Sequence, residues 1–118
     1  MANPSTVGGT GAGTEVLRRK YTSGATSYSV MIDGVADHIY TVVSLTITNV
    51  TAGAGTFGIR VMIDGSTSCI ILDNSTTHPA AGTFVFNDKL SLVGTDHLEV
   101  YTSVSSDIYV TYIDQTFA

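Results

Sequence analysis

The chain has 118 residues, of which 43% are hydrophobic and only 13% are charged, and its formal net charge is −5. This length suits one domain with a hydrophobic core, and the hydrophobic share excludes a largely disordered chain. The acidic balance argues against nucleic-acid partners, and no run approaches the ~20 apolar residues of a membrane-spanning helix. The single cysteine, Cys69, rules out an internal disulfide. So low a share of charge favours surfaces that a partner covers.

The N-terminal residues 1–13 are small, polar and rich in glycine, and we expect them to form an extended arm beside a β-sandwich domain of residues 14–118. They contain no secretion signal, so we expect synthesis in the cytoplasm. Residues 15–21 predict an edge strand with three of the five basic residues. Charged side chains on an edge strand discourage its pairing with other strands, and they can also contact an acidic partner. The candidate partner-contact residues are Val7, Gly8, Gly9, Arg18, Arg19 and Lys20.

Two further strands are predicted in the first half of the chain. Residues 28–32 alternate between apolar and polar side chains, and the glycine-containing segment 22–26 is expected to be a turn that separates them from the edge strand. Residues 36–50 form the longest alternating run. In this run the side chains expected to face the core are those of Ile39, Val43, Leu45 and Ile47.

The stretch from Gly55 to Asn74 predicts a β-hairpin. Apolar residues alternate up to Asp64-Gly65, a dipeptide that suits a two-residue turn in which both residues have positive φ. With this loop Ile63 is expected to pair with Ser66, and the same register extends along both strands. The buried face of the hairpin is then expected to carry Phe57, Ile59, Val61, Ile63, Ile70 and Leu72.

Four shorter strands are predicted after the hairpin, over residues 83–87, 89–93, 97–104 and 107–114, with a turn at Ser105-Ser106 between the last two. No segment has the apolar spacing of an amphipathic helix. About nine short strands at spacings of about 8 to 12 residues predict an all-β protein. We expect a single antiparallel β-sandwich of jelly-roll type, with about 8–9 strands and an extended N-terminal arm.

Residues able to carry out chemistry are few. His97 and Glu99 share one face of a predicted strand, but a zinc site needs a third ligand, and none is evident. No catalytic-serine, phosphate-loop or zinc-protease motif occurs in the chain. We therefore expect no enzyme activity, no metal site and no cofactor. The six tyrosines and four phenylalanines are expected to pack in the core rather than to form a sugar-binding platform.

A series of motifs runs along residues 40–114. It begins with a strand that ends at Asn49, a loop of Gly, Ala and Thr, and a strand that closes on Asp64-Gly65. It continues with the run Pro79 to Thr83, the pattern Leu90, Leu92, Gly94, Asp96, Leu98 and Val100, and a final strand with Tyr109. In this order the motifs resemble those of the small β-sandwich structural proteins of tailed bacteriophages, although Thr95 is inserted between Gly94 and Asp96 relative to the tightest form of the pattern.

The resemblance implies a function in the virion. The leading function that it implies is that of a capsid cement (decoration) protein on the capsid exterior. Such a protein is expected to form a homotrimer and to stabilise the assembled shell by binding the major capsid protein. No nucleic-acid or membrane partner is expected. A tail, neck or baseplate component is the alternative. A carbohydrate-binding module is a further alternative, and it would require an exposed aromatic cluster or a carboxylate-bound calcium ion.

Overall fold

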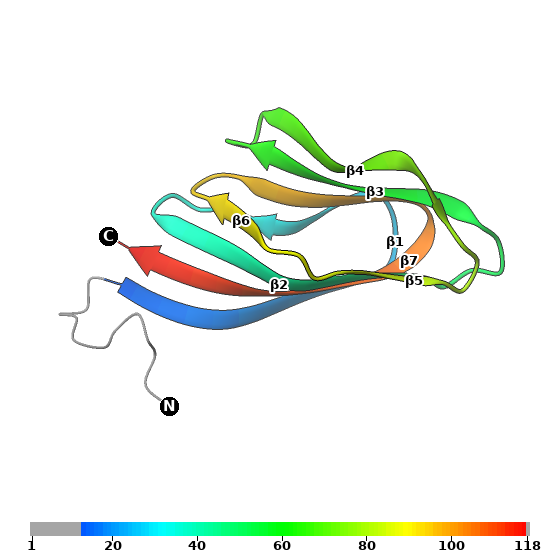
Figure 1. The fold of residues 1–118 in the computed structure, drawn as a ribbon, viewed down its shortest axis with the longest axis horizontal. Helices are drawn as coiled ribbons and strands as arrows, with labels where there is room; N and C mark the ends of the chain where they lie inside the picture. The colour runs from blue at the N-terminus through cyan, green and yellow to red at the C-terminus, as the bar shows by residue number, and fades with distance from the viewer. Residues whose placement is uncertain (1–12, 118) are drawn as a thin grey trace.

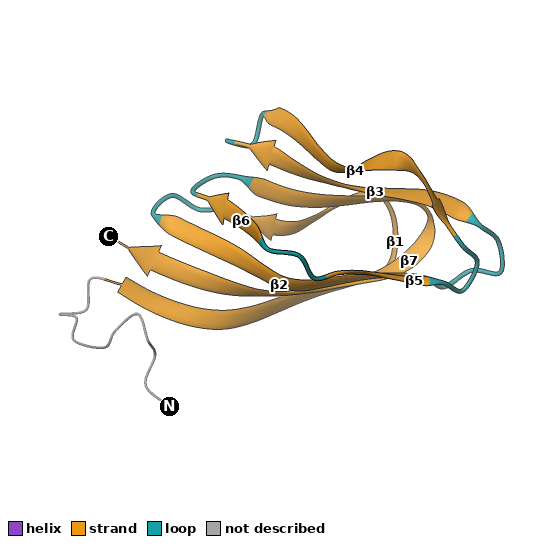
Figure 2. Cartoon of the chain, viewed as in Figure 1, coloured by secondary structure: helices purple, strands orange, loops and turns teal. Residues whose placement is uncertain are grey.

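The computed structural model describes residues 13–117, and every element assigned there is a β-strand (Figures 1 and 2). All the strand pairs are antiparallel, so the predicted all-β antiparallel fold is confirmed. The part of the chain that the structure describes includes no helix able to cross a membrane. The strands are β1 (Gly13–Asp33), β2 (His38–Asn49), β3 (Gly55–Ile63), β4 (Thr67–His78), β5 (Thr83–Phe86), β6 (Leu90–Val93) and β7 (His97–Phe117).

One sheet curls on itself into two layers. The central strand β7 pairs with β1 along its whole length, with β3 in its first half and with β2 in its second half. Layer A consists of β2, β5, β6 and the paired segments 13–22 of β1 and 106–117 of β7. Layer B consists of β3, β4 and the paired segments 27–33 of β1 and 97–102 of β7. Figure 1 shows the two layers joined where β1 and β7 bend.

The structure has seven strands where 8–9 are expected, because β1 and β7 continue through two segments predicted as turns. Both segments lie at the bend between the layers. The β1–β7 register shifts on either side of Ala25, which pairs with Ser106. Gly24 and Ser27 have positive φ values of 65° and 63°, which redirect β1 without ending its pairing. The turn-forming residues thus make a corner in a continuous ladder.

The core fills the space between the two layers. Apolar side chains at alternate strand positions point inward from both layers and exclude water from the interior. Phe84, Phe86 and Leu90 of the short strands β5 and β6 pack against its margin. The large side chains that are almost completely buried are Met31, Ile32, Leu45, Ile47, Ile59, Leu92, Leu98, Val100, Ile108 and Val110.

A bulge in β2 changes which of its residues face the core. The register with β7 shifts between Val42 and Ser44, so even-numbered residues face inward before the bulge and odd-numbered residues after it. Leu45 is buried as expected, but the prediction that Ile39 and Val43 face the core is wrong. Val43 is 44% exposed. The extra residue of a bulge cannot be read from the alternation of side chains alone.

The turn of the β3–β4 hairpin has the predicted conformation. Asp64 and Gly65 have φ values of 52° and 71°, and the N–H of Ser66 donates to the carbonyl of Ile63 at 3.0 Å. The predicted register is nevertheless wrong by one residue, because Ile63 pairs with Thr67 and not with Ser66. Such a shift turns the side chains of one strand to the opposite face.

The register shift exposes part of the hairpin that was expected to be buried. Ile70 pairs with Arg60 on the outer face of layer B, and its side chain is 53% exposed. Ile63 at the turn is also exposed. The remaining residues of the predicted buried face do meet the core, namely Phe57, Ile59 and Val61 as buried side chains and Leu72 as a partly buried one.

Asn49, the last residue of β2, is fully buried and holds two loops together. Its amide nitrogen donates to the carbonyls of Gly53 at 2.9 Å, Pro79 at 3.1 Å and His78 at 3.3 Å. Its amide oxygen accepts from the N–H and the hydroxyl of Thr51 at 2.9 and 2.6 Å. One side chain therefore satisfies backbone groups from both loops.

Replacing Asn49 with alanine should lower the free energy of unfolding by roughly 2–4 kcal/mol, because each buried polar group left without a partner costs about 1–3 kcal/mol. Chemical denaturation of the two proteins measures the difference. The neighbouring Thr48→Ala substitution is the control, and it should change the stability by less than about 1 kcal/mol. Equal unfolding midpoints for the Asn49 variant and the unsubstituted protein would contradict this account.

His78, at the end of β4, is completely buried beside the ring of Phe57, with 4.6 Å between the ring centroids. Neither of its ring nitrogens has a hydrogen-bond partner among the described residues. Burial lowers the pKa of His78 below its ordinary value, because the charged imidazolium loses its hydration. The folded protein therefore holds His78 in its neutral form at neutral pH.

The unfolded chain takes up the His78 proton more readily than the folded chain, so acid should destabilise the fold. The His78 contribution to stability is complete above the ordinary histidine pKa of about 6.5 and declines as the pH falls through that value toward the lowered pKa. Denaturant unfolding at about pH 7.5 and about pH 5.5 should show a smaller loss of stability for His78→Phe than for the unsubstituted protein. Equal losses would show that His78 does not contribute.

Candidate functional site

Side chains from three strands meet on the outer face of layer A. Tyr21 of β1 lies directly opposite Tyr109 of β7, which lies opposite Thr46 of β2. In the next row, Asp107 of β7 lies opposite Thr48 of β2. Because alternate residues of a strand share a face, both rows project from the same side of the layer.

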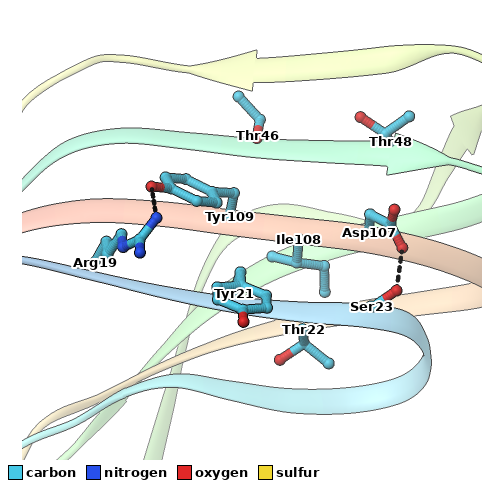
Figure 3. A pocket seen from close by; sticks show the side chains of 9 residues that line it. All are labelled: Arg19, Tyr21, Thr22, Ser23, Thr46, Thr48, Asp107, Ile108 and Tyr109. Atoms are coloured by element: carbon cyan, nitrogen blue, oxygen red, sulfur yellow. Dashed lines mark hydrogen bonds between the residues drawn. The ribbon is translucent and has the colours of Figure 1, made fainter.

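These side chains form the wall of an open pocket of about 460 Å³. Its volume falls within the range of about 300–1,000 Å³ that is usual for small-molecule sites. Figure 3 shows a hydrogen bond at each end of the pocket, Arg19 to Tyr109 and Ser23 to Asp107, with Tyr21 between them. The lining residues are Arg19, Tyr21, Thr22, Ser23, Thr46, Thr48, Asp107, Ile108 and Tyr109.

Two exposed tyrosines give the pocket an aromatic surface. The rings of Tyr21 and Tyr109 are nearly parallel, at 12°, and their centroids are 6.3 Å apart. Tyr21 is 65% exposed and Tyr109 is 38% exposed. This offset arrangement leaves ring surface open to solvent. The prediction that the tyrosines pack in the core is therefore wrong for these two residues, although it holds for Tyr40, which is buried.

Charged groups of opposite sign lie at the two ends of the pocket. Arg19 donates from Nη1 to the hydroxyl of Tyr109 at 3.3 Å, and this hydrogen bond raises the pKa of the exposed Arg19 guanidinium, which stays charged. Asp107 accepts through Oδ1 from the N–H of Gly24 at 2.9 Å and from the hydroxyl of Ser23 at 3.2 Å. Asp107 thus fixes the start of the bend in β1 and supplies a carboxylate to the pocket.

The three basic residues predicted to contact a partner do not form one patch. Arg19 lies in the pocket, whereas Arg18 and Lys20 project from the opposite face of the strand. Lys20 donates from Nζ to the carbonyl of Val30 at 2.7 Å, which ties the two halves of β1 together across the layers. The other predicted contact residues, Val7, Gly8 and Gly9, lie outside the described residues.

Arg18 belongs to a separate cluster around the buried carboxylate of Asp114. Asp114 accepts from Nε of Arg18 at 2.8 Å and lies 2.6 Å from Nδ1 of His38. The ring of His38 stacks on Tyr40, whose hydroxyl accepts from the N–H of Val35 at 3.0 Å. Burial raises the pKa of Tyr40. These groups satisfy one another, so the cluster serves to join β1, β2 and β7.

The charged groups on the outer face of layer B are held by contacts with one another and with Tyr28. Arg60 forms an ion pair with Glu99 at 2.7 Å, and its guanidinium lies 3.8 Å from the ring centroid of Tyr28. His97 lies 3.0 Å from the carboxylate of Asp33. Glu99 and His97, which share a strand face, are therefore each held by a different residue. Within residues 13–117 no group of three potential metal ligands comes together.

Sequence reasoning identified Arg19 but missed the residues that surround it. The alternation of Arg19 and Tyr21 along an edge strand places both on one face, which is a local signal. Their partners on β7 are about 88 positions away, since Tyr21 pairs with Tyr109. That pairing depends on how the whole chain folds, so no local pattern could have found the pocket.

Comparison with known proteins shows the fold and no family. No protein-family model and no curated protein sequence matches the chain. A protein of the Bacillus endospore appendages, described as a novel family of disulfide-linked pili, aligns with a TM-score of 0.55 and 9% identity over 90% of this chain and 88% of that chain. At this identity the likeness shows a shared fold.

Two viral structures align less closely. A pentameric capsid protein isolated from metagenomic phage sequences has a TM-score of 0.46 and 18% identity over 85% of this chain and 61% of its own. A chain of the T13 IBDV viral particle has a TM-score of 0.49 and 10% identity over 86% of this chain and 31% of its own. The chain thus spans only part of both proteins, and neither alignment is close enough to support a conclusion about function.

Proposed function

We propose that this chain is a structural, non-catalytic protein of a virion: a capsid cement (decoration) protein on the outside of the shell. It binds the assembled major capsid protein and itself. The resemblance of residues 40–114 to phage structural proteins supports this function. The observation that carries the proposal is the unprotected edge of β4.

The first part of the β4 edge, residues 67–72, is uncharged and mostly exposed. Among the described residues β4 pairs only with β3, so its other side presents unpaired backbone N–H and C=O groups. Residues 67–71 are all exposed and include Ile70 and Ile71, and no charged residue occurs from Gly65 to Leu72. A neutral segment of high β-propensity on a free edge aggregates unless a partner covers it. This edge therefore fits a protein that works in an assembly.

The edge of β1 differs from that of β4. It carries Arg18, Arg19 and Lys20, and Lys20 donates a hydrogen bond to the carbonyl of Val30. Charged side chains of this kind discourage indiscriminate strand pairing. The contrast with the charged edge of β1 supports a partner for the edge of β4, which is also longer than the short uncharged strands β5 and β6.

The contact made by the β4 edge joins the copies of a homotrimer in this proposal. When the β4 edge of one copy meets a different surface of the next copy, the contact is head to tail, and such contacts close into rings when the rotation allows it. A shared fold with a protein of the endospore appendages, which are described as pili, supports a subunit that associates repeatedly. A trimer also presents three binding sites to the shell, which raises its avidity.

Stabilisation of the shell follows from selective binding. A protein that binds the assembled shell, and not its dissociated subunits, shifts the equilibrium toward assembly by mass action. The free energy of binding comes from the apolar surface that becomes buried at the contacts. A face with few charged residues can be buried without the cost of removing water from ions. No catalytic group is needed for this activity.

The Ile70→Lys substitution tests the role of the β4 edge. It places a charge in the neutral segment and should convert a trimer of the 12.4 kDa chain into monomers. Size-exclusion chromatography with light scattering gives the mass directly. Val43→Lys is the matched control, because Val43 is 44% exposed and lies on the face of layer A instead of on the β4 edge.

The expected result is a monomeric Ile70 variant beside a trimeric Val43 variant. A trimeric Ile70 variant, or an unsubstituted protein that stays monomeric at high concentration, would contradict the assembly through β4. Circular dichroism of both variants should confirm that the fold is retained.

Deleting residues 2–13 should weaken or abolish binding to shells of the major capsid protein, because this segment is predicted to be a contact arm. All but Gly13 of this segment lies outside the described residues. Cosedimentation with assembled shells measures the occupancy, and full occupancy by the truncated protein would refute the role of the arm. Electron cryomicroscopy of virions would place the protein on the head, as proposed, or on the tail, which would instead support the alternative of a tail, neck or baseplate component.

A further inference from the structure

The pocket on layer A exposes two kinds of surface. One is the aromatic surface of Tyr21 and Tyr109, two offset rings on neighbouring strands. The other is a set of hydrogen-bonding groups around those rings. A ligand that fits the pocket must therefore offer an apolar face and polar groups together.

The polar groups include donors, acceptors and hydroxyls that do both. Arg19 supplies further N–H donors beyond the one directed at Tyr109, and Asp107 supplies a carboxylate whose Oδ2 has no hydrogen bond to a described residue. Hydroxyls line the pocket from both sides. They belong to Ser23 on β1 and to Thr46 and Thr48 on β2, whereas the hydroxyl of Thr22 is directed at Sδ of Met31.

The pocket is close to neutral, since Arg19 and Asp107 offset one another. A nucleic acid or another polyanion would meet one cation beside a carboxylate, on a chain with a net charge of −5. An alkyl chain or lipid tail would leave the arginine, the carboxylate and the hydroxyls without partners after losing their water. Both ligand classes therefore fit poorly.

We propose that this pocket is a binding site for a neutral saccharide. A pyranose ring has a face of C–H groups that stacks on Tyr21 or Tyr109, and its hydroxyls both donate and accept hydrogen bonds. Asp107 accepts from sugar hydroxyls, and Arg19 donates to them. The site requires no calcium ion. It does not depend on the cement function, because the pocket lies on the face of layer A and the proposed self-association uses the β4 edge of layer B.

An array of immobilised neutral oligosaccharides, terminated in glucose, galactose, mannose or N-acetylglucosamine, tests the proposal with the full chain. The unsubstituted protein should retain at least one class of these sugars, and titration calorimetry with that free oligosaccharide gives the affinity. Tyr21→Ala and Asp107→Asn should each weaken binding by roughly tenfold or more, because each removes a direct contact to the sugar.

Tyr28→Ala is the matched control for the tyrosine substitution. Tyr28 is 40% exposed, against 65% for Tyr21, and it lies on layer B, where its ring contacts Arg60 away from the pocket. Tyr21 is an exposed edge residue, so its alanine variant should keep the fold even if the Asp107 variant, which gives the bend a neutral and weaker acceptor, does not. Retention of no neutral sugar by the folded protein would overturn the proposal, as would equal affinities of the Tyr21 and Tyr28 variants.

Discussion

The continuous pairing of β1 with β7 through a shared bend is the constraint on which the rest of the structure depends. At this corner the buried hydroxyl of Thr102 donates to the carbonyl of Ala25 at 2.9 Å, and Ala25 pairs with Ser106. Because both strands change direction together, one ladder supplies strands to both layers. The layers cannot slide past one another without breaking it, so the corner fixes how β2 and β3 face each other across the core.

The same corner shapes the pocket. Asp107 lies just beyond the bend in β7 and accepts from Gly24 and Ser23 of β1. Its carboxylate therefore holds the corner in place and also lines the hollow beside the exposed ring of Tyr21. Local stability and the proposed sugar contact share one residue. This is why a conservative change to asparagine is more informative there than a truncation.

The two proposed activities use separate surfaces. The pocket is on the outer face of layer A, between β1, β7 and β2, whereas the neutral edge of β4 borders layer B. Self-association through β4 would leave the pocket uncovered. A trimer on a shell would then present three copies of a weak sugar site at once, and repeated weak contacts gain strength through avidity.

The sequence by itself determined the features that depend on neighbouring residues. The alternation of apolar and polar side chains predicted an all-β chain, and the Asp64-Gly65 dipeptide predicted a turn with positive φ. The positions of the apolar residues in this alternation predicted that Ile59 and Val61 are buried. These depend on backbone sterics and on period-2 geometry, which act over a few positions.

Only the tertiary structure decided the registers, the number of strands and the pocket. One extra residue in β2 turned the side chain of Val43 from the core to the solvent. A shift of one residue in the register between β3 and β4 exposed the side chain of Ile70. Bulges of this kind are set by the twist and packing of the whole sheet, so alternation alone does not show them. The pairing of Tyr21 with Tyr109 depends on closing a loop of most of the chain. It forms because the two layers together bury a core that neither strand could bury alone.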